Sequence, residues 1–310
     1  MNTRRRLDGR AMGLMIFFCA ILGMQQIVIK LAAPDMSPML QIALRSGMAA
    51  LLIALYLVWR ELPLLPGKGQ RLFGLVAGLL FTLEYLFVAE GLRFTTASHM
   101  VTMLYTAPAF AALGLHFLVR EERLHPLQWL GILIAFLGVT IAFYEKNGSL
   151  RHISANSMLF GDLLGILAGL SWGVTTVILR TKLSETPATQ AAFIQLLTCC
   201  CLLLPTTLLL GQFTFSLTTI VWASLFFQTL LVCVIGMLLW FWMLTVYPAS
   251  QLGALSFLTP VFGIVFGVVL LAEPLEAQFI LGAAMVLVGI SLVSGWQWLC
   301  QHPLRRRKLA

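Results

Sequence analysis

A carboxylate lies inside one of the most apolar stretches of this chain. Glu84 is followed by Tyr85, and leucine and phenylalanine residues flank the pair on both sides. A charge near the centre of a lipid bilayer costs on the order of 3 kcal/mol on insertion scales, so an acidic residue there is a candidate for a functional role. We expect Glu84 to bind a proton or a cationic group of a small solute. A structural ion pair with Arg45 is the alternative.

Aromatic side chains add a second kind of candidate. Tyr105, Trp172 and Trp240 lie deep in apolar stretches, where together with Tyr85 they could form a wall for flat or cationic solutes. Thr176 follows Trp172 by one helical turn, so these two side chains share a face that we expect to meet the solute. Contact with lipid is the alternative for the tryptophans.

Two further ionisable residues lie within apolar stretches. His99 is near the start of one of them and could change its charge in the physiological pH range. A purely structural role is the alternative for this histidine. Arg45 lies about 10 Å into another stretch at ~1.5 Å per residue, a depth that favours a buried partner or snorkelling over solute contact.

A mixture of histidine and glutamate residues follows one apolar stretch. Its members are His116, Glu121, Glu122, Arg123 and His125. Their spacing matches no metal-binding motif, so we expect a polar helix boundary, with no metal ion and no cofactor. The chain also lacks a nucleophile with a base and oxyanion partner, and it lacks a phosphate-binding glycine loop. An enzyme is therefore not expected.

The elements that must position these residues are membrane-spanning helices. Hydrophobic residues make up 60% of the 310 residues and charged residues 10%, which leaves too little polar surface for a water-soluble globule. A helix needs roughly 20 apolar residues to cross a bilayer. We expect an all-α integral membrane protein with ten spans at 11–32, 38–59, 72–92, 96–119, 127–145, 159–181, 187–210, 218–243, 248–272 and 276–299.

The basic residues predict how these spans are oriented. With ten spans, 15 of the 20 lysine and arginine residues fall on the side that holds both termini, and only four fall on the other side. Basic loops favour the cytoplasmic side, so both termini are expected there, in a multi-pass protein of the plasma (inner) membrane. The same distribution accounts for the net charge of +8 without a nucleic-acid partner, because no single module gathers the basic and aromatic residues.

The sequence between 96 and 143 is repeated between 248 and 294. Thr96-Ala97-Ser98, Pro108, Glu122, Gly131 and Gly138 correspond to Pro248-Ala249-Ser250, Pro260, Glu273, Gly282 and Gly289. Two related halves with an odd number of spans each must be inverted relative to one another in a membrane. We therefore expect a first repeat at 1–145, a connection at 146–158 and a second repeat at 159–310, arranged around a central cavity.

Proline and glycine positions indicate where the spans bend and where they touch. Pro108 and Pro260 each fall in the middle of a predicted span, where proline frees a backbone carbonyl that a cavity or a neighbouring helix must satisfy. We expect kinks that border the cavity, with a simple structural bend as the alternative. Glycines at every fourth position predict a close helix-packing seam at Gly161, Gly165, Gly169 and Gly173.

Several of these segments resemble a known repeat. Thr95-Thr96-Ala97-Ser98, Tyr105-Thr106-Ala107-Pro108, Glu121-Glu122-Arg123-Leu124 and the glycines from Gly131 to Gly138 are similar to the repeat of the EamA family in the drug/metabolite transporter superfamily. Trp172-Gly173 resembles the opening of that repeat, although the first half has Leu22 before its Gly23. The resemblance implies ten helices around a central cavity and transport of small organic solutes, often outward.

Three classes of function follow from these patterns. We favour a secondary carrier that exports amino acids or similar small metabolites by gradient-driven alternating access, with protons as one candidate driver. Efflux of cationic drugs or of a lipid-linked substrate is a second possibility, and a non-transporting membrane scaffold or sensor is a third. The internal duplication is compatible with a monomer or a homodimer.

Overall fold

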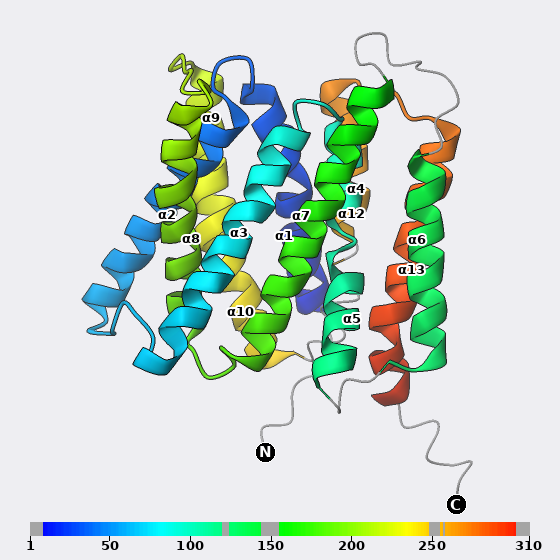
Figure 1. The fold of residues 1–310 in the computed structure, drawn as a ribbon, viewed down its shortest axis with the longest axis horizontal. Coiled ribbons are helices and arrows are strands. Elements are labelled where there is room, and N and C mark those ends of the chain that lie inside the picture. The colour runs from blue at the N-terminus through cyan, green and yellow to red at the C-terminus, as the bar shows by residue number, and fades with distance from the viewer. Residues whose placement is uncertain (1–8, 120–123, 144–154, 248–254, 257, 302–310) are drawn as a thin grey trace, which may run out of the picture.

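The chain folds into a bundle of helices (Figure 1). The computed structural model describes residues 9–119, 124–143, 155–247, 255–256 and 258–301. The helices are α1 (Gly9–Ala32), α2 (Pro38–Trp59), η1 (Lys68–Gln70), α3 (Arg71–Gly91), α4 (Ala97–Leu104), α5 (Ala107–Leu118), α6 (Pro126–Phe143), α7 (Ala155–Thr181), α8 (Ala188–Leu209), α9 (Thr219–Phe226), η3 (Phe227–Gly236), α10 (Met237–Val246), α12 (Leu258–Leu271) and α13 (Ala277–Gln301).

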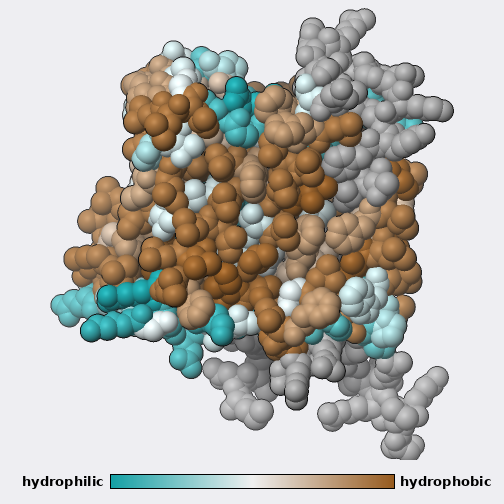
Figure 2. Space-filling model, in the orientation of Figure 1, coloured by the Kyte–Doolittle hydropathy of each residue, from teal (hydrophilic) through white to brown (hydrophobic). Residues whose placement is uncertain are grey.

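The apolar composition of these helices makes this an integral membrane protein. Among the described residues, seven helical segments are long and apolar enough to cross a bilayer, and three further apolar helices are shorter. Helices suit lipid because each backbone polar group finds its partner within the helix. Figure 2 shows apolar residues over most of the visible face, with hydrophilic residues at the lower edge and at the upper edge. The expected all-helical membrane fold is thus present, while crossing by all ten helices stays a prediction.

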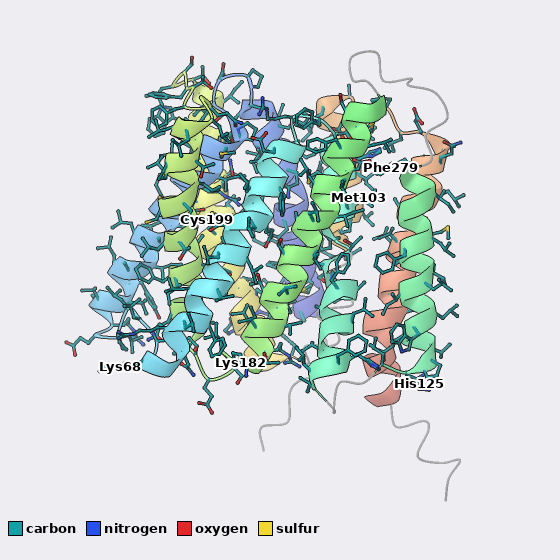
Figure 3. All side chains as sticks on the ribbon, in the orientation of Figure 1. Lys68, Met103, His125, Lys182, Cys199 and Phe279 are labelled. Carbon is teal, nitrogen blue, oxygen red and sulfur yellow. The ribbon has the colours of Figure 1, made fainter. Side chains whose placement is uncertain are left out.

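The helices run in opposite directions between the two ends of the bundle, which are the upper and lower edges in Figure 1. In Figure 1, α1 and α3 run upward, whereas α2 and α7 run downward. Gly9 and Gln301, the first and last described residues, both belong to helix ends near the lower edge. Lys68 and Lys182 lie at this same edge, which Figure 3 labels. Most of the connection expected at 146–158 lies outside the described residues.

The expected mid-helix kinks at the two prolines are not observed. Residues 105 and 106 form a turn that separates α4 from α5, and Pro108 lies in the first turn of α5. Pro260 likewise lies in the first turn of α12, where the Thr259 N–H donates to the Ser256 carbonyl at 3.0 Å. Proline is tolerated in a first turn because the N–H it lacks would have no helical partner there. Pro108 therefore begins a new helix after a break in its span, and Pro260 lies in the first turn described for α12.

The span expected at 218–243 contains an unusual segment. It is built from α9, η3 and α10 in succession, and η3 is a π-helix of 10 residues. Gln228 of η3 donates to the Gln41 Oε1 of α2 at 3.0 Å and to the Ser224 Oγ of α9 at 2.8 Å. All three side chains are buried. Segments of π-helix occur frequently at functional sites.

Helices α6 and α13 form a close pair at one edge of the bundle (Figure 1). A Cβ atom added to Gly138 of α6 would lie 2.6 Å from the Gly282 carbonyl oxygen of α13. A Cβ added to Gly289 of α13 would meet the Gly131 carbonyl oxygen of α6. Glycine is needed at both crossings because the two backbones touch directly.

Two further glycine contacts are equivalent to each other. One joins α1 to α12, and the other joins α7 to α5. A Cβ on Gly23 would lie 2.8 Å from the Phe262 Cβ, 2.9 Å from the Gly263 nitrogen and 2.9 Å from the Thr259 oxygen. A Cβ on Gly173 would lie 2.7 Å from the Phe110 Cβ, 3.1 Å from the Ala111 nitrogen and 3.0 Å from the Ala107 oxygen. The residues contacted in α12 correspond to those contacted in α5, because their numbers differ by the repeat offset of 152 residues. The same contact is thus made twice.

The three other glycines of the α7 seam also pack closely. Gly161 faces the backbone nitrogen of Thr95, Gly165 faces the Met103 side chain, and Gly169 faces the Leu104 carbonyl, each within 3.0 Å of an added Cβ. The glycine seam of α7 therefore packs against α4 and the turn that follows it. This contact fixes where the break between α4 and α5 lies in the bundle.

Candidate functional site

Glu84 lies in the interior of the bundle on α3. Its side chain is buried, with 5% relative exposure. Among the described residues, no hydrogen bond or ion pair to its carboxylate is found, although Arg45 of α2 is near enough to act on it electrostatically. The structural ion pair that the sequence left open is therefore not formed. A buried carboxyl group that is not held in an ion pair is a candidate for contact with a ligand.

Tyr85 and Arg45 form the second part of this site. The Arg45 guanidinium lies 4.3 Å from the centroid of the Tyr85 ring. The Tyr85 hydroxyl accepts a hydrogen bond of 3.5 Å from the Gln25 amide of α1. Arg45 is 1% exposed, so of the two alternatives expected for it, a buried partner or snorkelling, its side chain does not snorkel to the surface. The α2, α3 and α1 helices thus meet through polar groups inside the membrane.

An aromatic group borders the same region. Tyr105, in the turn between α4 and α5, contacts the Trp172 ring of α7 edge to face, with centroids 5.3 Å apart. Trp172 and Tyr85 both pack against one buried apolar cluster that includes Met100 and Ala168. Thr176 lies one turn after Trp172 and donates to the Trp172 carbonyl at 3.0 Å. The break before Pro108 therefore places Tyr105 beside the tryptophan.

Two predicted site residues lie elsewhere. Trp240 of α10 stacks on Phe18 of α1, with centroids 5.2 Å apart and rings 13° from parallel. It belongs to a separate apolar cluster with Met15 and Met243. His99 lies near the upper end of α4, where its ring stacks on Phe279 of α13 at 3.9 Å. Figure 3 labels Phe279 near this end of the bundle.

A buried ionic network surrounds the start of α4. The Glu273 carboxylate accepts hydrogen bonds from the Ala97 N–H at 2.7 Å, the Ser98 N–H at 3.0 Å and the Ser98 hydroxyl at 2.6 Å. Lys30 of α1 donates to the Thr95 carbonyl and lies 3.8 Å from the Glu273 carboxylate. Glu273 thus caps α4 from a distant part of the chain, where its charge suits the helix dipole.

Asp162 of α7 completes this network. It lies 2.8 Å from the His99 Nδ1, and it accepts a hydrogen bond from the Thr95 hydroxyl. Sequence reasoning missed Asp162, although an acidic residue four positions into a predicted span was a signal that could have found it. His99 is therefore part of the network at the upper end and does not belong to the group around Glu84.

Replacing Glu273 with alanine is expected to destabilise the protein by about 2 kcal/mol, because three buried donors lose their acceptor. The midpoint of thermal unfolding in detergent measures this loss. Glu276→Ala is the matched control, since the Oε1 of Glu276 makes no hydrogen bond with the described residues. Equal unfolding midpoints in the two variants would contradict the capping role.

The histidines of the mixed histidine and glutamate segment serve as local acceptors. His116 Nδ1 accepts from the Leu124 N–H at 2.9 Å, and His125 Nδ1 accepts from the Leu127 N–H at 3.3 Å. Glu121, Glu122 and Arg123 lie outside the described residues. Within the described part of the chain, no three histidine, cysteine or acidic side chains are placed to hold a metal ion.

A hollow at the upper end is distinct from the expected central cavity. Its lining includes Ser37, Leu92, Arg93 and Gln212, with Ala33, Pro38, Gly211 and Thr214. None of the predicted solute-binding residues contributes to it. The group around Glu84 lies deeper, between α1, α2, α3 and α7.

The apolar helical bundle defines an integral membrane protein, and comparison with known proteins identifies its family. The model of the EamA-like transporter family matches residues 9–144 and 159–295. These two matches span most of the chain. The protein therefore belongs to the EamA-like transporter family, as its sequence resemblance indicated, and it is a membrane transporter.

Several relatives have names that describe transport. An uncharacterized transporter of Bacillus subtilis strain 168, YoaV, is 25% identical over 87% of this chain and 91% of its own length. Probable amino-acid metabolite efflux pumps of Escherichia coli K12 and Salmonella typhimurium LT2 are 23% and 26% identical. They cover 92% and 89% of this chain, and the matches span 95% and 92% of the pumps.

A solved structure has the same fold. It is a crystal structure of a protein, and it superimposes with a TM-score of 0.64 at 16% identity. The match covers 95% of this chain and all of the solved chain. The arrangement of helices described above is therefore found in an experimental structure.

Proposed function

We propose that the protein is a secondary transporter that exports amino acids or similar small organic metabolites. The observation that carries this proposal is the group formed by buried Glu84 and Arg45 with partly buried Tyr85, which offers a carboxylate, a guanidinium and an aromatic face at membrane depth. Ionisable groups at membrane depth cost free energy in lipid, and a polar solute that passes between them would account for their presence. The names of the E. coli and Salmonella relatives support amino-acid metabolites as the solute class.

The proposed mechanism is alternating access between two inverted repeats. The paired contacts of Gly23 and Gly173, and those of Gly131 with Gly289 and Gly138 with Gly282, support this arrangement. A two-fold axis in the membrane plane relates each contact to its counterpart. The network around Glu273 then closes the upper end. A gradient, with protons as the candidate ion, supplies the energy.

The proposed orientation places the lower end in the cytoplasm of the cell that makes the protein. Lys68, Arg71 and Lys182 gather at this end, with the basic residues of both termini expected beside them. Ten spans in the plasma (inner) membrane satisfy this charge distribution. Single cysteines at Lys68 and at Gln212 of the opposite end would then react with a membrane-impermeant thiol reagent from opposite sides.

Transport is tested with the purified protein in liposomes. A panel of radiolabelled amino acids is added outside liposomes with an acidic lumen, so that proton antiport would drive accumulation. We expect saturable uptake of at least one amino acid that collapses when the pH gradient is removed. Uptake of quaternary amines in place of amino acids would favour the drug-efflux alternative, and no uptake of any solute would contradict the proposal.

Trp172→Ala is expected to lower this uptake by about tenfold, because one aromatic contact to a bound solute is worth about 1 kcal/mol or slightly more. The variant should keep the unfolding midpoint of the wild type to within a few degrees, since Trp172 is only partly buried. Trp222→Ala, at an exposed position on α9, is the matched control. Unchanged kinetics in Trp172→Ala would remove this side chain from the solute pathway.

A further inference from the structure

Arg45 is a buried cation, and two of its three guanidinium nitrogens lack a hydrogen-bond partner among the described residues. Its side chain is among the largest that are fully buried, with 1% relative exposure. Its Nε and Nη1 atoms have no hydrogen-bond partner among the described residues. Buried polar groups in proteins are nearly always paired, and a buried unpaired charge costs several kcal/mol. A purely structural arginine would have a carboxylate or backbone carbonyls around it.

The groups that surround Arg45 satisfy its N–H donors only in part. The Tyr85 ring covers a flat face of the guanidinium at 4.3 Å. Tyr85 also interacts with Arg45 through a side-chain hydrogen bond, yet Nε and Nη1 have no partner among the described residues, because the ring covers the flat face and the N–H groups lie in the plane of the guanidinium. Cys199 of α8 and Cys233 of η3 also lie near it, and Cys199 already accepts a hydrogen bond from Ser46 at 3.6 Å. Neutral thiols of this kind are weak acceptors for a guanidinium.

Glu84 adds the opposite charge next to this cation. It acts on Arg45 electrostatically from the neighbouring position of Tyr85 on α3, yet no ion pair joins the two side chains. The site therefore presents a guanidinium with two unpaired nitrogens beside a buried carboxyl group with which it forms no ion pair. A solute that carries both charges would neutralise both groups at once.

We propose that Arg45 and Glu84 bind the two ends of a zwitterion, with the solute carboxylate on Arg45 and the solute ammonium on Glu84. The planar fork of an arginine matches a carboxylate through two parallel hydrogen bonds, and Nε together with an Nη atom is one such pair of donors. This inference rests on the proposed transport function and names the substrate class: α-amino acids and other zwitterions of that length. Solutes with only one of the two charges leave the other buried group unpaired.

The test uses three probes that differ only in their charged groups: phenylalanine, phenethylamine without the carboxylate, and 3-phenylpropionate without the amine. Binding to the full-length protein in detergent is measured by the shift in its unfolding midpoint, and uptake is measured in liposomes. We expect wild type to bind phenylalanine at least about tenfold more tightly than either analogue, since a lost charged partner costs more than 1.4 kcal/mol. Arg45→Gln should bind phenylalanine and phenethylamine about equally.

Stability provides a readout that separates binding from a structural role. Arg45 makes no hydrogen bond through Nε or Nη1 to the described residues, so Arg45→Gln should unfold at or above the wild-type midpoint. Arg93→Gln, in an exposed ion pair with Glu90 at 2.8 Å, is the control and should leave the probe preferences unchanged. Arg45→Lys keeps the charge without the planar fork, and it should bind phenylalanine more weakly than wild type while still rejecting phenethylamine.

Each outcome has a defined meaning. Retained rejection of phenethylamine by folded Arg45→Gln, or wild-type protein that binds neither phenylalanine nor 3-phenylpropionate, overturns the carboxylate subsite. If Arg45→Gln does not fold, the loss indicates a structural arginine and also overturns it, unless Arg45→Lys folds and shows the expected weakening. Binding of phenylalanine without any uptake keeps the subsite and contradicts transport. Uptake of another solute without binding of any carboxylate keeps transport and contradicts the subsite.

Discussion

Replacing Glu84 with glutamine is expected to abolish gradient-driven transport, lowering uptake in liposomes by about 100-fold or more. Glutamine has nearly the same shape, so the change removes the charge and the proton-binding oxygen without opening a cavity. Loss of one partner from a buried charge pair costs about 3 to 5 kcal/mol, which corresponds to a factor of more than 100. Initial rates of uptake with an acidic lumen measure the effect, beside the unfolding midpoint of the variant.

Glu90→Gln is the matched control for this variant. Glu90 lies on the same helix, but at its upper end, where it pairs with Arg93 and accepts a hydrogen bond from Gln212 at 2.6 Å. Uptake should change by no more than about twofold in this control. If Glu84→Gln accumulated solute as fast as wild type, Glu84 would have no part in binding or coupling. If Glu84→Gln still exchanged solute across the membrane but no longer responded to the pH gradient, the role of Glu84 would be limited to proton coupling.

Leucine in place of Gly173 is expected to prevent stable folding. An added Cβ would lie 2.7 Å from the Phe110 Cβ and 3.0 Å from the Ala107 carbonyl oxygen, so the backbones of α7 and α5 would have to separate. Overpacking of this kind costs about 3 kcal/mol or more when a backbone must move. The fraction of monodisperse protein after detergent extraction and its unfolding midpoint measure the loss.

Gly23→Leu should have the same effect, because its contact with α12 repeats that of Gly173 with α5. Gly13→Leu is the control on the same helix, since no atom lies within 4 Å of a Cβ at that position. A large loss in Gly173→Leu without a comparable loss in Gly23→Leu would show that the two contacts are not equivalent. Such a result would also weaken the proposed two-fold relation of the repeats.

The sequence predicted most of the helices because apolar length and turn residues are local signals. The span expected at 38–59 is observed as Pro38–Trp59, where Ser37 accepts the Leu40 N–H and Pro38 occupies the first turn. The turn at Tyr105 and Thr106 was not predicted. An apolar run that contains a proline is compatible with either a bent helix or a new one. The choice depends on the contact with Gly169, which belongs to a helix more than 60 residues further along the chain.

The candidate site was predictable only in part. Glu84 and Tyr85 could be selected because charge and aromaticity in an apolar span are visible in the residues themselves. The unpaired Nε and Nη1 of Arg45 could not be predicted in the same way, since the neighbours of this side chain come from α3, α8 and η3. Trp240 and His99 have the same residue types as true site candidates, yet α10 and the start of α4 hold them in other clusters.

The crossed glycine contacts constrain how the chain can be assembled during synthesis. Helix α1 enters the membrane first, but its partner surface on α12 is made more than 200 residues later. Until then the glycine face of α1 has only lipid or transient neighbours. Neither half, produced separately, would contain its own complement, so fragments divided between the repeats should recover a stable fold only when both are made in the same cell.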